Sequence, residues 1–198
     1  RFMGPRFRRM IAWTSMRYLA LLRGINVGGN NIIPMKKLKA SFEALGFSDV
    51  ATFIQSGNVL FTAPSGSMKA LEKKIETALS RDFSYTTSVV LISKAHLEAV
   101  VRDAPKGFGS EPEAYRYDVL FLKAPLTGKT AIKDVPTKEG VDAVHAGKNV
   151  LYFSRLVAKI TKTKLTKIVG TPIYKQMTIR NWNTTSRLAK MMGKGKGA

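Results

Sequence analysis

Hydrophobic residues in the first half of the chain follow two patterns, short continuous runs and runs at helical spacing. The short runs are typical of buried strands, which we expect at residues 17–23, 50–55, 59–62 and 86–92. Between them, apolar side chains recur every three or four residues, which predicts amphipathic helices at 35–45 and 68–81. The resulting order, βαββαβ, is the split βαβ arrangement of ferredoxin-like folds.

The second half repeats this order after a connecting segment. The connection is a helix expected at 94–102, with Ser93 as its N-cap, and a loop at 104–114 that contains two prolines and two glycines. Strands are then expected at 117–123, 142–145, 150–154 and 176–179, and helices at 127–134, 161–169 and 184–192. The sequence therefore predicts an α+β protein of two βαββαβ subdomains similar to the ferredoxin-like fold, linked by a helix and loop.

These elements suggest a domain organisation. We expect a first ferredoxin-like subdomain at 16–93, a linking helix and loop at 94–114, and a second ferredoxin-like subdomain with a C-terminal helix at 115–192. Residues 1–15 carry four arginines, no acidic residue and no clear periodicity. They are expected to be a disordered or non-native N-terminal extension, with a short basic arm as the alternative. Residues 193–198 are expected to form a flexible tail.

The charge of the chain is strongly positive and unevenly distributed. The 198 residues include 33 lysines and arginines and 13 aspartates and glutamates, which gives a net charge of +20. The last acidic residue is Asp142, and twelve basic residues follow it. A surface of one sign attracts polyanions, so nucleic acid or a phosphorylated small molecule is the expected partner. Solvated basic tails are the alternative explanation of the charge.

The composition argues against several kinds of site. The absence of cysteine excludes disulfides and thiolate chemistry, and with only two histidines, His96 and His145, no metal or cofactor is predicted. Glycine-rich nucleotide motifs and the G-x-S-x-G motif are absent, and no catalytic residue is predicted. No apolar run could span a bilayer, so we expect a cytoplasmic location and no membrane partner. The oligomeric state is left open.

Three polar segments could bind an anion. The first is a loop of glycines and asparagines between a strand and a helix, where backbone N–H groups can hold an anion. The second is a glycine hairpin, and the third offers a guanidinium, amides and an indole that can stack on a ring. The predicted ligand-binding residues are Arg23, Asn26, Gly28, Gly29, Gln55, Ser56, Asn58, Arg180, Asn181, Trp182, Asn183 and Thr184.

The same residues also admit a structural interpretation. In it, Trp182 belongs to the core, Arg180 pairs internally and Asn183 is only the N-cap of the last helix. We also expect the loop after the first strand and the hairpin at 55–58 to lie at opposite ends of their sheet. They could then share a site only if the two subdomains pack together.

Three separated motifs make the chain similar to a known family. They read MRYLALLRGINVGG at 16–29, FIQSGNV at 53–59 and TIRNWNT at 178–184, and they resemble a bacterial family designated domain of unknown function 1697. The resemblance extends over roughly residues 16–192. It implies two α+β subdomains similar to the ferredoxin-like fold, and it implies no reaction, substrate or cofactor.

The sequence thus leads to three functional hypotheses. The first is a binding module for an anionic partner, either nucleic acid or a phosphorylated ligand. The second is a small metal-independent enzyme that uses the arginine, asparagine and glycine loops as an anion clamp. In the third, the motifs are purely structural.

Overall fold

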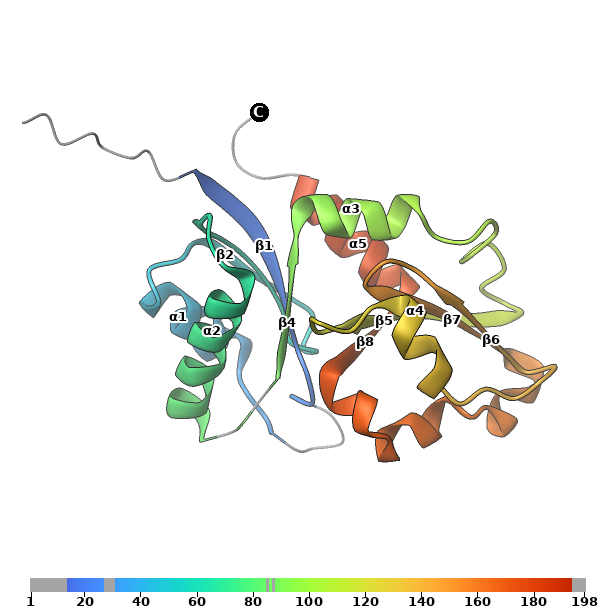
Figure 1. Ribbon diagram of the computed structural model, residues 1–198. Helices are drawn as coiled ribbons and strands as arrows, with labels where there is room; N and C mark the ends of the chain where they lie inside the picture. The colour runs from blue at the N-terminus through green and yellow to red at the C-terminus, as the bar shows by residue number, and fades with distance from the viewer. Residues whose placement is uncertain (1–13, 27–30, 85, 87, 194–198) are drawn as a thin grey trace, which may run out of the picture.

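The computed structural model describes residues 14–26, 31–84, 86 and 88–193, which form two four-stranded antiparallel sheets (Figure 1). The first half of the chain supplies β1 (Ser15–Leu22), α1 (Met35–Ala44), β2 (Ser48–Phe53), β3 (Asn58–Pro64), α2 (Met68–Phe83) and β4 (Val89–Ser93). The strands lie in the order β2-β3-β1-β4. The predicted βαββαβ arrangement is confirmed for this half.

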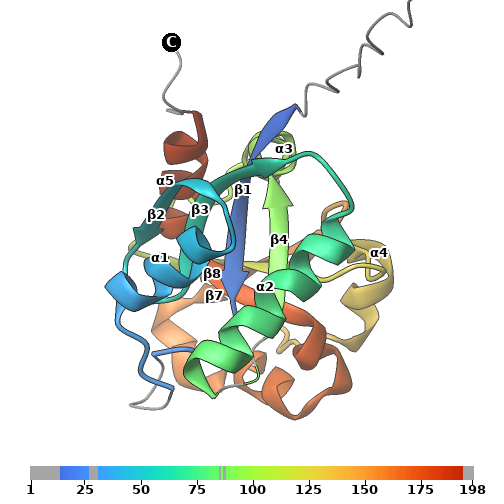
Figure 2. The same ribbon diagram turned by 90° about the vertical axis from the view of Figure 1, so that its left-hand side faces the viewer.

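One face of the first sheet packs against α1 and α2 (Figure 2). Side chains alternate along β1, so Tyr18, Ala20 and Leu22 join the core on the side of these two helices. Leu19 and Leu21 point to the opposite face, where they join a second core. Both faces of β1 are therefore buried, which explains why its sequence is a continuous apolar run.

The second sheet repeats the arrangement of the first. Its strands are β5 (Tyr115–Leu122), β6 (Asp142–Ala146), β7 (Val150–Leu156) and β8 (Met177–Asn181). They lie in the order β6-β7-β5-β8, so β5 takes the central position that β1 has in the first sheet. The short helix expected between β5 and β6 is present as α4 (Gly128–Ala131) followed by a 3-10 turn, η1 (Ile132–Asp134).

The helix predicted at 161–169 is wrong. Three 3-10 segments lie between β7 and β8, namely η2 (Val157–Lys162), η3 (Leu165–Gly170) and η4 (Pro172–Gln176). The carboxylate of Asp142 explains the break, because its Oδ1 accepts a hydrogen bond from the Thr163 hydroxyl at 2.6 Å and its Oδ2 accepts one from the Lys164 N–H at 2.9 Å. These bonds hold the backbone of Thr163 extended, with ψ at 146°, where a continuous helix would need a helical residue.

Two helices occupy the layer between the sheets. They are α3 (Lys94–Arg102) and α5 (Trp182–Gly193). The predicted cap of α3 is confirmed, since Ser93 Oγ accepts a hydrogen bond from the His96 N–H. The predicted cap of α5 is wrong: Asn181 caps the helix in place of Asn183, and its Oδ1 accepts a hydrogen bond from the Thr184 N–H at 2.7 Å.

The two halves of the molecule share a core around α3 and α5 (Figure 1). Leu19 and Leu60 of the first sheet and Val119 and Phe121 of the second belong to one buried cluster. The helices contribute Leu97, Val100, Leu188 and Met192 to it. Each sheet is therefore covered on its outer face by its own helices or turns and on its inner face by the same pair.

Two of the expectations concern the ends of the chain, which the structure describes only in part. Residues 1–13 and 194–198 lie outside the described residues, so the proposed extension and tail, and the subdomain boundaries drawn with them, stay predictions. Among the helices in the described ranges, none is long and apolar enough to cross a membrane.

Candidate functional site

Arg180 of β8 lies at the junction of the two halves and is buried, with 7% of its surface exposed. Its Nε donates a hydrogen bond to Asn58 Oδ1 at 2.6 Å. Its Nη2 donates to the backbone oxygens of Leu22 at 2.8 Å and Ser56 at 2.9 Å. Nη1 donates within β8, to Thr178 Oγ1 and to the oxygen of Ile179, each at 2.8 Å. A guanidinium has five N–H donors, and these five bonds engage them all.

The electrostatic setting of Arg180 is unusual. Its hydrogen-bond acceptors are all neutral, and burial lowers its pKa from 12.5 to about 10. A cation surrounded by carbonyl and amide oxygens is held by their dipoles. Arg180 therefore connects the second sheet to the first, and all five of its N–H donors are engaged in these hydrogen bonds.

The partners of Arg180 lie at one end of the first sheet, where β1 ends and β3 begins. The two strands are antiparallel neighbours, Leu21 pairs with Asn58, and the Leu22 N–H donates to the oxygen of Gly57 at 2.8 Å. Beyond this point, Asn26 Nδ2 donates to the oxygen of Gln55 at 2.9 Å. The expectation that the exit loop and the hairpin lie at opposite ends of the sheet is wrong, because the end of a strand lies beside the start of its antiparallel neighbour.

The hairpin glycine in this junction is required by its surroundings. Gly57 has φ at +73°, and a Cβ atom there would lie 2.8 Å from Leu22 Cβ. The neighbouring Asn58 is fully buried, and its Nδ2 donates to the oxygen of Phe53 at 3.0 Å and to Ser56 Oγ at 2.9 Å. The hairpin is therefore fixed by close packing and by hydrogen bonds on the side that faces Arg180.

A second contact between the halves involves Arg23. Its Nη1 donates to the backbone oxygen of Tyr174 at 3.1 Å, and its guanidinium carbon lies 4.9 Å from the centre of the Tyr174 ring. Gly28 and Gly29, which were predicted to offer backbone N–H groups, lie outside the described residues. The structure thus brings Arg23 and the 55–58 hairpin into contact with the second half of the chain, and Asn26 is bonded to that hairpin.

The remaining predicted residues face a different part of the molecule. Asn181, Trp182 and Asn183 line a hollow of about 260 Å³ together with Gly109, Pro112, Tyr115, Arg116 and Tyr117. A second hollow, of about 240 Å³, is lined by Tyr115 and Tyr117 again and by residues that include Lys106, Phe108, His145 and Ser154. Thr184 is buried at the start of α5, where its N–H is bonded to Asn181.

Aromatic side chains form the wall between these hollows. The ring centre of Phe108 lies 4.9 Å from that of Tyr117 and 5.2 Å from that of Trp182, in edge-to-face geometry. Tyr115 lies 6.0 Å from Tyr117. We call Phe108, Tyr115, Tyr117 and Trp182 the aromatic surface. All four side chains are only partly buried.

Sequence reasoning missed most of this surface. Tyr115 and Tyr117 occupy alternate positions of β5, on the face that carries Val119 and Phe121 further along the strand. The sequence signal was present as two tyrosines flanking Arg116 at the start of a predicted strand. Their approach to Trp182 depends on the pairing of β5 with β8, which places Asp118 opposite Asn181.

A metal centre is not suggested by the described part of the chain, in which no three histidine, aspartate or glutamate side chains gather. His96 lies on α3 and His145 on β6.

Comparison with known proteins supports the fold. The chain is similar to the solved structure of the conserved bacterial protein SP0830 from Streptococcus pneumoniae, with a TM-score of 0.76 and 28% identity. The match covers 90% of this chain and 99% of that one. A search of curated proteins gives no match. The family model described as "Protein of unknown function (DUF1697)" matches residues 16–152, and the chain belongs to this family.

Proposed function

We propose that the protein is a binding module for an anionic partner, and that this partner is single-stranded nucleic acid bound on the aromatic surface. The observation that carries the proposal is the position of Tyr115 and Tyr117, which line both hollows. A strand that crosses these side chains could place one base on either side of them. Base–aromatic stacking is worth about 1–3 kcal/mol per base and tolerates any base.

Each hollow also contains a cation for a phosphate group. Arg116 lines the first hollow and is exposed, and its Nη1 donates to the oxygen of Pro112 at 2.8 Å, which orients the guanidinium. Lys106 lines the second hollow. Asn181 and Asn183 supply amides that can pair with the edge of a base. The two hollows therefore offer aromatic rings for the bases, cations for the phosphate groups and amides for the edges of the bases.

The position of the tyrosines on a central strand adds support by analogy. Four-stranded sheets of RNA-recognition motifs bind single strands by stacking bases on aromatic side chains of the sheet. Here β5, which carries Tyr115 and Tyr117, is a central strand of a four-stranded sheet. The analogy concerns the chemistry of binding and implies no common family.

A phosphorylated small molecule is the second candidate. The hollow of Asn181, Trp182 and Arg116 would by itself accept a ring with one phosphate. Such a ligand would use one hollow, whereas a strand would use both. The sharing of Tyr115 and Tyr117 between the hollows favours the strand.

The test is fluorescence anisotropy with a labelled oligouridine, a labelled oligothymidine and a duplex of the same length, measured over a salt series. We expect single strands to bind more tightly than the duplex and part of the affinity to persist as salt rises. Tyr117→Leu should weaken single-strand binding about 5- to 150-fold, from the loss of one stacked base. Arg116→Ala should weaken it less and reduce the salt dependence.

Tyr174→Leu is the matched control, because Tyr174 contacts Arg23 and lies outside both hollows. Its affinity for single strands should equal that of the wild type. Equal affinities for duplex and single strand, lost together as salt rises, would mean that the net charge of +20 alone attracts the nucleic acid, and the proposal would be wrong. Binding of nucleoside monophosphates as tight as that of the oligomers would favour the second candidate.

A further inference from the structure

The strand β6 forms one edge of the second sheet, and its hydrogen bonds show which of its backbone groups face outward. It pairs with β7 without a register shift over its whole length. Just beyond its ends, the Gly147 N–H donates to the oxygen of Val150 at 2.9 Å, and the Leu156 N–H donates to the oxygen of Val141 at 2.8 Å. Bonded positions alternate along an antiparallel pair, so the odd-numbered residues of β6 bond to β7 and the even-numbered ones face the open side.

The open side of β6 carries the backbone groups of Asp142, Val144 and Ala146. The Asp142 N–H is used, because it donates to the oxygen of Lys138 at 2.8 Å. The N–H and C=O groups of Val144 and Ala146 have no hydrogen-bond partner in the part of the chain that the structure describes. Ala146 is exposed and Val144 is only partly buried. This edge therefore offers a donor and an acceptor at each of two alternate residues.

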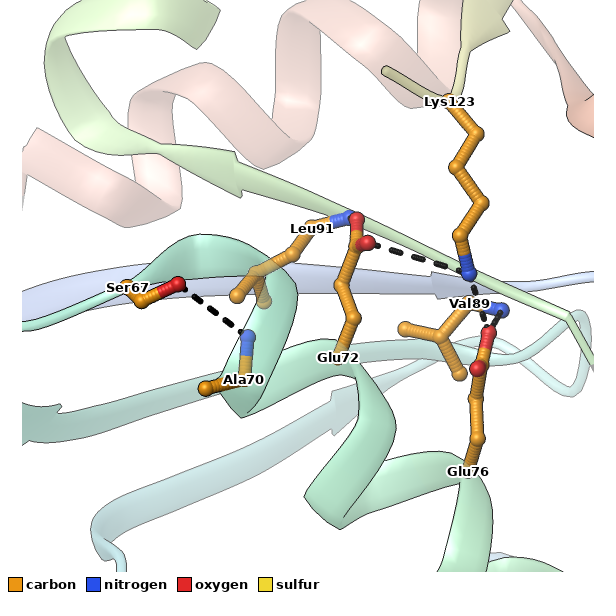
Figure 3. A network of polar contacts seen from close by, with 7 residues as sticks. All are labelled: Ser67, Ala70, Glu72, Glu76, Val89, Leu91 and Lys123. Atoms are coloured by element: carbon orange, nitrogen blue, oxygen red, sulfur yellow. Dashed lines mark hydrogen bonds and ion pairs between the residues drawn. The ribbon is translucent and has the colours of Figure 1, made fainter. Parts of the chain in front are cut away.

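The edge of the first sheet at β4 is closed by α2, as Figure 3 shows. Glu76 Oε1 accepts a hydrogen bond from the Val89 N–H at 2.8 Å, and Glu72 Oε1 accepts one from the Leu91 N–H at 3.1 Å. Lys123 pairs with both glutamates from the other half of the molecule. The outward N–H groups of Val89 and Leu91 are therefore not available to an added strand.

The edges at β2 and β8 are obstructed in other ways. Along β2 the register shifts between Ser48 and Ala51, and Asp49 has φ at +50°, so this edge is irregular. At β8 the N–H of Met177 and the oxygen of Ile179 are both bonded within the protein. Proteins protect edge strands in such ways because an open edge pairs with other chains. In the described ranges β6 has no comparable protection.

Lysines lie beside both ends of the β6 edge. The carboxylate of Asp142 accepts hydrogen bonds from the backbone N–H groups of Lys138 and Lys164, each at 2.9 Å, which places both lysines at the start of the strand. Lys148 follows the strand in the hairpin to β7. The charges of Lys167 and, more weakly, Lys138 lower the pKa of Lys164, so these three ammonium groups lie near one another. None of the four lysines forms an ion pair with a described residue.

The chemistry of this edge favours one kind of partner. Alternating backbone donors and acceptors match another polypeptide in extended conformation, and the backbone of nucleic acid carries no such alternation. The four lysines against Asp142 and Glu139 leave the surroundings positive, which favours an acidic segment. A second copy of the chain would bring a further net charge of +20 to this edge and would be repelled.

We propose that an acidic peptide segment of another protein binds in extended conformation as an added strand on the open edge of β6. Its backbone pairs with Val144 and Ala146, and its acidic side chains lie near the flanking lysines. Its side chains on the other face lie beside Ala143 and His145, which line the second hollow. The proposal does not rest on nucleic-acid binding, because that ligand would stack on side chains whereas this one pairs with the backbone.

The probe is a labelled octapeptide of alternating glutamate and valine, which in extended form carries its acidic side chains on one face. One control peptide has lysine in place of glutamate. The other keeps the glutamates and has two adjacent N-methylated amides in its middle, which block hydrogen bonds along both of its edges. In fluorescence anisotropy with the full chain, both controls should bind at least about tenfold more weakly than the probe. No binding of the probe, or equal binding of the N-methylated peptide, would overturn the proposal.

NMR of the unmodified protein locates the binding edge. On addition of the probe, the backbone N–H groups of Val144 and Ala146 should shift and gain protection from hydrogen exchange. The N–H groups of Val89 and Leu91, at the closed edge, are the internal control and should not change. Changes at the closed edge without changes at β6 would show that the peptide binds elsewhere, and the proposal would be wrong.

Substitutions test the same edge. Val144→Pro removes an N–H that the sheet does not use, so it should weaken peptide binding at least about tenfold and keep the circular dichroism spectrum. Lys164→Gln should weaken it about two- to threefold, and Lys36→Gln, on the exposed side of α1, should have no effect. A dimer of the free protein that Val144→Pro dissociates would assign the edge to a second copy. Loss of oligothymidine binding in Val144→Pro with peptide binding intact would assign it to nucleic acid. Either result would refute the proposal.

Discussion

Replacement of Arg180 by methionine tests whether the guanidinium connects the two halves of the molecule. Methionine is unbranched like arginine but shorter, is uncharged and cannot donate a hydrogen bond. The change leaves Asn58 Oδ1, the oxygen of Leu22 and the oxygen of Ser56 without the donors that they have now. All three acceptors lie at the end of the first sheet, so the variant removes the link from β8 to that sheet.

The size of the effect follows from two opposing terms. Each buried acceptor that loses its partner costs about 2 kcal/mol, so three acceptors cost about 6 kcal/mol. Burial lowers the pKa of Arg180 from 12.5 to about 10, and at about 1.4 kcal/mol for each pKa step the buried charge itself costs about 3 kcal/mol. Methionine removes that cost. The net loss in the free energy of unfolding should be about 3 kcal/mol.

Urea unfolding followed by circular dichroism measures this difference. Arg187→Met is the matched control: Arg187 is exposed on α5, and its loss should change the unfolding free energy by less than about 0.5 kcal/mol. Arg180→Lys keeps the charge but loses the planar fork, and it should also destabilise the protein. An Arg180→Met variant as stable as Arg187→Met would refute the connector interpretation and return Arg180 to the candidate ligand contacts.

Two further changes test other parts of the structure. Tyr152→Phe removes the hydroxyl that donates to the oxygen of Val100 at 2.7 Å and should lower the free energy of unfolding by about 1–2 kcal/mol in urea; no change would mean that this bond between β7 and α3 is not formed in solution. The pKa of His96 is lowered in the folded protein, so the unfolded chain takes up its proton first as the pH falls below about 6.5. The free energy of unfolding should therefore fall towards lower pH, by at most about 1.4 kcal/mol per pH unit from this group, and His96→Phe should reduce that slope. An unchanged slope in the variant would show that His96 does not contribute.

Most of the fold could be predicted because the elements of this chain are marked by local signals. The strands are short apolar runs buried on both faces, as in β1, and α2 has apolar residues on one face over four turns. Glycine links between the second and third strands of each half indicated hairpins. The order βαββαβ followed from these signals without knowledge of any long-range contact.

The errors arose where a distant residue decides the local structure. Asp142, at the start of the edge strand β6, bonds to Thr163 and Lys164 and breaks the helix predicted there. The correct cap of α5 is one of two asparagines that flank Trp182, and local sequence did not distinguish them. The loop after β1 and the hairpin before β3 were expected at opposite ends of the first sheet. The antiparallel pairing of the two strands places them at the same end.

The candidate sites were predicted only in part, for a related reason. The chemistry of Arg180, Asn58 and Asn26 predicts ligand contacts. In the structure these side chains instead form hydrogen bonds between segments of the protein itself. The aromatic surface requires the pairing of β5 with β8, and the cavity lined by Glu72, Val90 and Leu122 requires β4 to lie beside the end of β5. Neither juxtaposition has a signature in local sequence.

The position of α5 between the sheets has a consequence during synthesis of the protein. The inner face of the first sheet, with Leu19 and Leu21, is covered in part by Leu188 and Met192 of α5. A ribosome that adds about 5–20 residues per second needs roughly 5–20 s to make the 100 residues that separate β4 from the end of α5. During that interval the first sheet can form but cannot be fully covered, so the nascent chain presents an apolar surface that a ribosome-associated chaperone would recognise.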